Sequence, residues 1–398
     1  MSKEELYPGR EQTLVKHIIL ENYLERFAHI IGHRWDTITY VDCFSGPWKS
    51  RSLKLEDTSF SIALAELRRA RKTHADPTKV KNPKVLKLRC FFLEKDKAAY
   101  AKLDEFARSA SDAEVRTRHA TFEDSIANIH EFVRAGGQNS FAFLFIDPTG
   151  WTGFPMETIA PLLRIQPGEV LVNFMTSFIR RVIESPDEAT QASLDELFGR
   201  HVPKERFKLL SGIDLDDALA EEYSRSIASV GDFKFVRTAI VLHPQIDKTH
   251  FHLIYATRHP KGVEVFKAAE KSAMKAMETA RADAKQRKRE TSGQQDLFES
   301  DVLDSSHYDW LRERYTSRAR QRVLAMMQAQ PKVAYDDAWD SALTDPLVWE
   351  SDLKTWIDEW RTEGLVRIPE LVGRESVAKR GKRHMLVWCG SSPTSTAA

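Results

Sequence analysis

The sequence predicts an α/β fold, in which a Rossmann-like sheet of five parallel strands with an antiparallel terminal pair precedes a small winged-helix domain. Short apolar runs alternate with helix-like segments at the spacing of a βαβ series. Two further β-rich runs are joined by a link too short for a crossover helix, which favours antiparallel pairing. The end of the chain reads as three helices and a β-hairpin, the outline of a winged helix.

Five runs are the expected parallel strands, four of them apolar and rich in β-branched and aromatic residues and the third of them weaker. They lie at 37–43, 87–93, 114–119, 141–146 and 169–174. Segments with helical periodicity precede the first run and separate the first four, at 11–31, 59–71, 98–110 and 121–137. Gly136 and Gly137 end the last of these segments, as glycine commonly does at a helix C-terminus.

The pattern changes after the fifth strand. Residues 185–230 are helical and polar, which indicates an insertion over the strand ends. Residues 233–242 and 251–257 are β-rich and are joined by HPQIDKTH. Because parallel neighbours need a connection of about a dozen residues or more, these two runs should pair antiparallel.

The length of 398 residues exceeds what one compact core usually holds, so two domains are expected. We assign residues 1–275 to the Rossmann domain. Residues 276–306 lose apolar periodicity and are charged, as in a helical tail that runs into a linker. Residues 307–398 are the winged-helix domain, whose first helix has its apolar positions at Tyr308, Leu311, Tyr315, Ala319, Val323 and Met326.

The charge balance, 59 Lys and Arg against 58 Asp and Glu, excludes a global attraction to nucleic acid or membranes, so any basic surface must be local. Cys43, Cys90 and Cys389 are far apart within apolar runs, and we expect reduced, buried thiols rather than disulfides or a zinc site. The N-terminus lacks the apolar core of a signal peptide, and no apolar run reaches the roughly 20 residues of a membrane span. A soluble cytoplasmic protein is therefore expected.

Acidic residues follow four of the expected parallel strands. Asp42 opens a Ser-Gly-Pro loop, and Glu94 ends the second strand, where a carboxylate can accept hydrogen bonds from ribose hydroxyls. Asp124, after the third strand, could meet an adenine amino group, and Asp147-Pro148 ends the fourth strand beside the reactive end of such a ligand. Any one of them could be only a helix cap or a turn former. Their combination in this order favours a cofactor site.

A set of motifs carries a resemblance to a known family: DCFSGP, FFLEKD, FLFIDPTG, EVLVNF followed by Arg180-Arg181, and LIYATRHPKG. Over residues 10–275 this set resembles the three-Cys-motif partner (TcmP) family, which looks like class I S-adenosylmethionine-dependent methyltransferases. The resemblance implies the sheet order 3-2-1-4-5-7-6, which agrees with the antiparallel terminal pair. It also implies S-adenosylmethionine as the cofactor and a three-cysteine, radical-enzyme-like protein as a partner.

The resemblance implies a role for each matching residue. Around the cofactor it places Asp42 and Gly46 at the methionine part, Glu94 at the ribose and Asp124 at the adenine, and Phe44 is a further cofactor-binding residue. Asp147 and Pro148 would face the methyl acceptor, with Asp147 orienting or deprotonating it.

Two positions depart from the methyltransferase pattern. Trp48 stands where a second glycine is usual, and its indole could fill the space of the methionine part or turn away from it. The sequence DPTG matches only the first half of the Asp-Pro-Pro-aromatic motif of amino methyltransferases, and the aromatic residue, Trp151, comes one place later. Trp151 could stack on a substrate base or could belong to the core, so transfer to an exocyclic amine is a hypothesis.

Basic residues follow the fifth strand. Arg180 and Arg181 could bind a phosphate or carboxylate of the substrate, or could be a solvated pair. His250 and His252 alternate along one strand and so share a face, but no third ligand is nearby, which favours structural histidines and no metal site.

The winged helix has an acidic third helix and a basic wing. Glu350, Asp352, Asp358, Glu359 and Glu363 outnumber the basic residues of that helix, which would repel phosphates in a major groove. Its apolar stripe, expected in the core, is Leu353, Trp356, Ile357 and Trp360. The wing carries Arg374, Lys379, Arg380, Lys382 and Arg383. Such a hairpin could bind phosphates without sequence preference, or it could be a solvated hairpin or dock a protein.

The function that these features favour is methyl transfer from S-adenosylmethionine to nucleic acid, either DNA or RNA. A first alternative is a non-catalytic, nucleic-acid-associated partner of the three-cysteine protein, in which Trp48 marks the loss of methyl transfer. A second alternative is a DNA-binding regulator whose Rossmann domain senses a metabolite.

Overall fold

The protein is described here by a computed structural model that covers residues 4–46, 50–292, 306–371 and 377–390. The chain divides into two compact units, Met1–Leu303 and Asp304–Ala398. Each unit is described by itself.

The first unit contains a seven-stranded sheet of order β3-β2-β1-β4-β5-β7-β6. Its strands are β1 (Thr37–Asp42), β2 (Lys87–Glu94), β3 (Glu114–His119), β4 (Ser140–Ile146), β5 (Gly168–Phe174), β6 (Phe235–Leu242) and β7 (Thr249–Thr257). β1 to β5 are parallel, whereas β7 runs antiparallel to both β5 and β6. The prediction of five parallel strands and an antiparallel terminal pair is confirmed, and the order is that of the class I methyltransferase-like fold.

The composition of each strand follows its place in the sheet. Every residue of β1 and β5 is buried, because helices cover both faces of a parallel sheet, and both strands therefore read as nearly continuous apolar runs. β3, with the sequence EVRTRH, is partly exposed along its whole length because it lies at the sheet edge. This edge position explains why the sequence of β3 is more polar, and predicts a strand less clearly, than the sequences of β1 and β5.

Alternate side chains of the central strands pack on opposite faces of the sheet. On one face the rings of Tyr40 and Phe143 stack with their centroids 6.1 Å apart, and Tyr23 packs on Phe143 at 5.2 Å. On the other face a cluster of buried side chains joins the strands to the helices that cover them; its members include Val41, Leu144, Val172, Ile129, Ile159 and Leu219.

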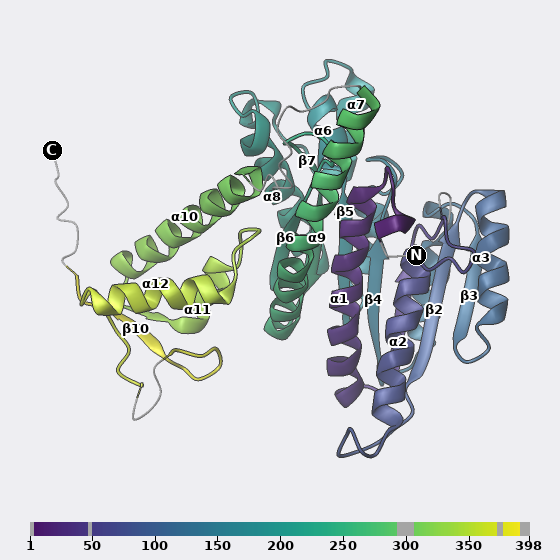
Figure 1. Cartoon of the computed structure of the whole chain (residues 1–398), viewed down its shortest axis with the longest axis horizontal. Coiled ribbons are helices and arrows are strands. Elements are labelled where there is room, and N and C mark those ends of the chain that lie inside the picture. Colours follow the sequence, from purple (N-terminus) through teal and green to yellow (C-terminus); the bar gives the residue numbers. More distant parts are fainter. Residues whose placement is uncertain (1–3, 47–49, 293–305, 372–376, 391–398) are drawn as a thin grey trace. The chain divides into compact units, whose positions relative to one another are not determined.

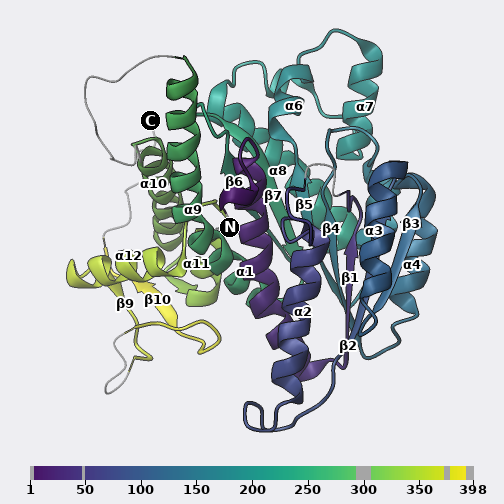
Figure 2. The same cartoon turned by 45° about the vertical axis from the view of Figure 1, so that its right-hand side comes forward.

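Helices cover both faces of the sheet (Figures 1 and 2). On the face of Tyr40, α1 (Glu11–Arg34) packs between α2 (Ser59–Ala75) and α9 (Pro260–Ser292), and a ring contact joins α2 to α3 (Lys97–Ser109). On the face of Val41, α5 (Met156–Leu163) contacts both α4 (Ile126–Arg134) and α8 (Gly212–Gly231). The insertion expected at 185–230 supplies α7 (Glu188–Phe198) and α8, as its helical sequence indicated, and α6 (Thr176–Val182) precedes it.

The second unit combines three helices with a three-stranded antiparallel sheet of order β8-β10-β9. Its elements are α10 (Ser306–Ala329), β8 (Lys332–Ala334), α11 (Tyr335–Ala342), α12 (Glu350–Thr362), β9 (Val366–Arg367) and β10 (Met385–Trp388). This is the element order of a winged helix. The stripe of α12 is buried as predicted, and the short strand β8 is an addition that the sequence analysis missed.

Three details differ from the sequence analysis. Residues 276–292, assigned to the linker, continue α9, and Met277, Ala280 and Ala284 are buried. In α10 the last buried position is Met327 rather than Met326. The expectation of three buried thiols is wrong for Cys389, which is exposed at the end of β10, whereas Cys43 and Cys90 are buried. Within the described residues, no helix combines the length and the apolar character needed to cross a membrane.

Candidate functional site

Three acidic residues end neighbouring parallel strands at one edge of the sheet. β1 pairs with both β2 and β4, so that Asp42 lies in register with Phe92 and Phe145. Glu94 and Asp147 come two residues after those partners. The carboxyl ends of parallel strands meet at the same edge, which is where open α/β sheets bind ligands.

Asp42 is fully buried and organises the loop that follows β1. Its carboxylate accepts hydrogen bonds from the Ser59 hydroxyl at 2.5 Å and from the Phe44 backbone at 3.1 Å. Burial raises the pKa of Asp42 from 3.8 to about 6; these hydrogen bonds oppose that rise, and the charge of Asp147 adds to it. Asp42 therefore shapes the loop and lies close enough to Asp147 to feel its charge.

A cavity of about 250 Å³ lies over the ends of β1, β2 and β4. Small-molecule sites typically span roughly 300–1,000 Å³, so this volume is near the lower end. The described residues that line it are Cys43, Phe44, Leu93, Glu94, Lys95, Ala120, Thr121, Phe122, Glu123, Pro148, Thr149, Gly150, Thr152 and Gly153. The structure thus brings Phe44, Glu94 and Pro148 together around one cavity.

The cavity has apolar walls and a few polar groups. The rings of Phe44 and Phe122 lie 5.2 Å apart, and Leu93 adds to the same surface. Glu94, only 3% exposed, accepts a hydrogen bond from the Asp96 backbone through Oε1 at 2.6 Å. A flat apolar surface beside a carboxylate at the end of β2 matches the chemistry of a nucleoside, whose base is planar and whose ribose donates hydrogen bonds.

The loop after β4 forms the opposite wall of the cavity. Gly153 has a φ of +87°, and a Cβ at this position would lie 3.2 Å from a carboxylate oxygen of Glu123. Glycine is needed here for the backbone conformation and for the close approach of Glu123.

Four of the residues proposed for the cofactor and the base do not line the cavity, and the first is the fully buried Asp42. Asp124 is exposed; its carboxylate accepts a hydrogen bond from the Thr121 hydroxyl, and its backbone N–H donates one to the same oxygen. Glu123 rather than Asp124 lines the cavity. Gly46 is half-buried, and Trp151 is partly buried against the core cluster. Trp48 lies outside the described residues.

Both carboxylate oxygens of Asp147 are engaged. Asn173, at the end of β5, donates to Oδ1 at 2.7 Å, and the ammonium group of Lys16 forms an ion pair with Oδ2. The side chains of Lys16 and Asp147 are only 10% and 13% exposed. Asn173 is buried and its own Oδ1 has no hydrogen-bond partner. The result is a polar cluster of three side chains from α1, β4 and β5.

The sequence analysis missed Lys16 and Asn173. Asn173 stands in the motif EVLVNF, where a polar residue near the end of a buried strand could have been noticed. Lys16 is the one Lys or Arg in the first half of α1, but its pairing with a residue 131 positions away depends on tertiary structure.

The structure separates the two arginines that follow β5. Arg180 binds the nearly buried carboxylate of Asp216 on α8 at 2.5 Å, so its charge is compensated within the protein. Arg181 is exposed on α6, with its guanidinium 5.2 Å from the centre of the Phe178 ring.

The two histidines of β7 differ in their surroundings. His252 is buried and shares a hydrogen bond of 2.7 Å with the Thr176 hydroxyl, and burial lowers its pKa to about 3. Burial also lowers the pKa of the half-buried His250 to about 4; the smaller contributions come from neighbouring positive charges, His243, Lys16, Arg181 and Arg180. Both rings are therefore neutral at pH 7. Within the described residues, no group of three or more His, Cys, Asp or Glu side chains could hold a metal ion.

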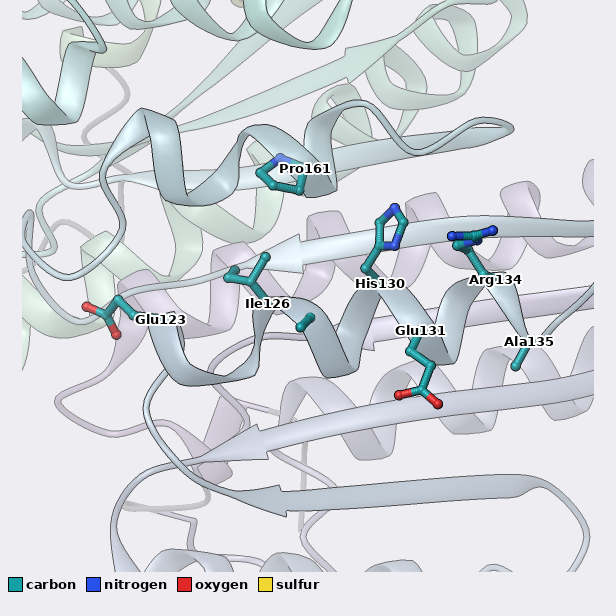
Figure 3. A pocket seen from close by; sticks show the side chains of 8 residues that line it. Glu123, Ile126, His130, Glu131, Arg134, Ala135 and Pro161 are labelled. Atoms are coloured by element: carbon teal, nitrogen blue, oxygen red, sulfur yellow. The ribbon is translucent and has the colours of Figure 1, made fainter.

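A second hollow, of about 850 Å³, lies on the outer surface between α4 and α5 (Figure 3). Its lining includes Ile126, His130, Arg134 and Pro161, and it shares Glu123 with the cavity at the strand ends. Figure 3 shows Glu131 pointing away from Pro161, so the charged groups do not converge on one point. This surface offers no chemical site comparable to the cavity.

In the second unit the wing residues that the structure describes differ in exposure. Lys379, Lys382 and Arg383 are exposed. Arg380 lies with its guanidinium 5.3 Å from the centre of the Trp339 ring. Arg374 lies outside the described residues.

Comparison with known proteins gives distant structural similarity alone. No protein-family model matches the chain, and no curated protein does. A DUF519 protein from Legionella pneumophila has 13% identity and a TM-score of 0.38, covering 66% of this chain and 91% of its own.

Two further solved structures are similar at the same low level. Trm1 from Pyrococcus horikoshii, in complex with S-adenosyl-L-methionine, has 10% identity and a TM-score of 0.33, covering 80% of this chain and 87% of its own. Cofactor-bound Rv0187 from MTB has 12% identity and a TM-score of 0.29, covering 60% and 79%. The fold assignment rests on the strand order of the sheet rather than on these scores.

Proposed function

We propose that the chain is an S-adenosylmethionine-dependent methyltransferase that acts on nucleic acid. One observation carries this proposal. A cavity with aromatic walls and the Glu94 carboxylate opens at the carboxyl end of a sheet of order 3-2-1-4-5-7-6, and Pro148, next to Asp147, lines it. From the motif set we also infer that the chain belongs to the TcmP family.

The residues of the cavity fit an adenosyl cofactor. Phe44 and Phe122 would contact the planar base, and Glu94 would accept hydrogen bonds from the ribose hydroxyls. Thr121 and Glu123 are polar groups at the edge of the same surface. When bound, S-adenosylmethionine supplies a methyl group that its sulfonium already activates.

The task of the protein is then to orient the acceptor and to exclude water. A carboxylate offers about four lone-pair directions, and Lys16 and Asn173 occupy one on each oxygen of Asp147. The remaining directions can accept a hydrogen bond from an N–H of the acceptor. Lys16 and Asn173 hold the carboxylate in one orientation, as a positioned acceptor group requires.

Nucleic acid is the proposed substrate because of local basic surface. The chain as a whole is almost neutral, yet exposed cations gather on the wing at Lys379, Lys382 and Arg383. Phosphate contacts of this kind bind without sequence preference and weaken with salt.

Cofactor binding is tested by titration calorimetry with S-adenosylmethionine and S-adenosylhomocysteine. We expect Glu94→Ala to weaken binding about 10- to 100-fold, since hydrogen bonds to charged groups contribute about 1.5–3 kcal/mol. Glu105→Ala, an exposed glutamate on α3, is the matched control and should bind as the wild type does. Absence of any heat with the wild-type protein would remove the proposal.

Methyl transfer is tested with tritium-labelled S-adenosylmethionine and deproteinised RNA or DNA. Asp147→Asn should lower incorporation by about 100-fold or more, because the group that orients the acceptor loses its charge. If the variant binds the cofactor normally and transfers methyl groups at the wild-type rate, Asp147 has no part in the reaction.

A second candidate is a non-catalytic partner of a three-cysteine, radical-enzyme-like protein. The observation that favours it is that both oxygens of Asp147 are already engaged, by Lys16 and Asn173. In that case the cofactor binds but no nucleic acid becomes labelled, and the two proteins elute together after co-expression.

A further inference from the structure

Two polar side chains from different elements lie beside Phe251, and a third stands on α6, which contacts β7. The ammonium group of Lys16, on α1, lies 5.8 Å from the centre of the Phe251 ring and binds Asp147. The ring of His250, on β7, lies 5.4 Å from the Phe251 ring. α6, which carries Arg181, is joined to β7 by the hydrogen bond between Thr176 and His252. We call Lys16, Arg181 and His250 the rim.

The charges at the rim do not cancel. Lys16 is compensated by Asp147, and the neighbouring Arg180 by Asp216. Arg181 has no carboxylate within ion-pair distance among the described residues, and it is exposed. Phe174, two residues before α6, pairs antiparallel with His252, and α6 contacts β7, so Arg181 and His250 both lie beyond that pair at the same end of the sheet. Among the described residues, Arg181 is therefore the cation of the rim that no carboxylate compensates.

We propose that the rim is a phosphate-binding subsite that holds the backbone of a nucleic acid beside Asp147. Only one part of this inference rests on the proposed function, namely that the bound phosphate lies next to a methyl acceptor. Arg181 can bind two phosphate oxygens with its planar guanidinium. His250 can donate from one ring nitrogen while neutral, and Lys16 keeps N–H groups beyond the one used by Asp147.

The rim differs in two ways from the arginine pair that the sequence indicated. Arg180 is excluded because the nearly buried Asp216 holds it. Lys16 and His250 come from segments far from α6 in the sequence, and only the fold brings them near Arg181. A phosphate bound there would lie within reach of the residues that hold Asp147, so backbone binding and acceptor placement would share Lys16.

The test measures the binding of a short fluorescein-labelled oligothymidylate to the full chain by anisotropy, over a range of salt concentrations and without cofactor. We expect Arg181→Gln with His250→Gln to weaken binding about 10-fold at low salt. The slope of log affinity against log salt should fall by about 0.7 for each phosphate that the variant no longer neutralises. Arg26→Gln, an exposed arginine on the same helix as Lys16, is the control and should leave the slope unchanged.

The outcomes separate the rim from the rest of the chain. The double variant Lys379→Gln with Lys382→Gln should also lower the slope of log affinity against log salt. When it is combined with the rim variant, the two decreases should add. An unchanged slope in the rim variant, an equal fall in Arg26→Gln, or no binding by the wild type would overturn the inference. A lower slope in a chain that fails to bind S-adenosylmethionine would keep the rim and reject the proposed function.

Discussion

At the carboxyl end of the seven-stranded sheet, two carboxylates are largely buried and are each held by one cation, whereas in the C-terminal unit the acidic residues of α12 are mostly exposed, several of them in surface ion pairs, and the wing carries exposed cations. Asp147 is held by Lys16, and Asp216 by Arg180. In the second unit, α12 presents acidic residues to solvent, and the wing presents basic ones.

This contrast indicates what each region can do. Buried, paired charges have fixed positions and a strong mutual influence, which suits the placement of reacting groups. Exposed charges are screened and mobile, which suits general attraction to a polyanion. The exposed acidic residues of α12, Asp358, Glu359 and Glu363, make this helix unfit to enter a major groove. Under the proposed function, the exposed cations of the wing are therefore the candidate phosphate contacts of the second unit, and for this reason we rank a sequence-specific regulator last of the three functions.

The largest effect should come from breaking the Lys16–Asp147 pair. Lys16→Met leaves a nearly buried carboxylate without its cation, and we expect a loss of about 3–4 kcal/mol in the free energy of unfolding. Urea denaturation measures this loss. Arg26→Met, on the exposed side of α1, is the control and should change stability by less than about 0.5 kcal/mol. A double variant with Asp147→Asn should lose less than Lys16→Met alone, and additive losses would show that the pair is not coupled.

The next effect is the change of the free energy of unfolding with pH that the titration of Asp42 causes. Because burial raises the pKa of Asp42 above its ordinary value, the protonated group favours the folded state. This contribution is complete below about pH 3.8 and is lost as the pH rises through about 6. Its full size is about 3 kcal/mol. Asp42→Asn cannot ionise, so its free energy of unfolding, relative to wild type, should rise over that interval. A constant difference between the two proteins would show that Asp42 keeps its ordinary pKa.

The smallest effects test the separation of charge in the second unit. With a duplex probe, Lys379→Gln and Lys382→Gln should each lower the slope of log affinity against log salt by about 0.9 if each binds one phosphate. Glu363→Gln on α12, a change of the same size and opposite sign, should alter affinity less than about 2-fold, because exposed charges away from the contact are screened. A large gain in affinity with Glu363→Gln would show that α12, rather than the wing alone, lies against the nucleic acid.

Much of the fold could be predicted because the signals are local. The run Glu114–His119 and the five-strand series follow from side-chain composition, and the short link between the last two strands requires them to be antiparallel. The buried stripe of α12 follows from its periodicity. Short elements with weak patterns, such as β8, were missed because pairing with β10 rather than their own sequence defines them.

The candidate site could be predicted in part. The strand-end carboxylates Asp42, Glu94 and Asp147 were found because parallel strands end at the same edge, wherever their helices lie. Their roles were harder to predict. Asp42 is fully buried and accepts hydrogen bonds from its own loop and from Ser59, and Glu123 rather than Asp124 lines the cavity. Adjacent residues in a turn point in different directions, and spacing alone does not distinguish them.

The strands, the antiparallel terminal pair and the acidic residues at the strand ends follow from the amino-acid order alone, since hydrophobic periodicity and connection length act over a few residues. Which charges meet depends instead on the folded arrangement of the chain. Lys16 binds Asp147, 131 positions away, and Arg180 binds Asp216, 36 positions away, whereas the adjacent Arg181 is exposed. Electrostatic pairing depends on distance in space, and the packing of helices on the sheet sets that distance.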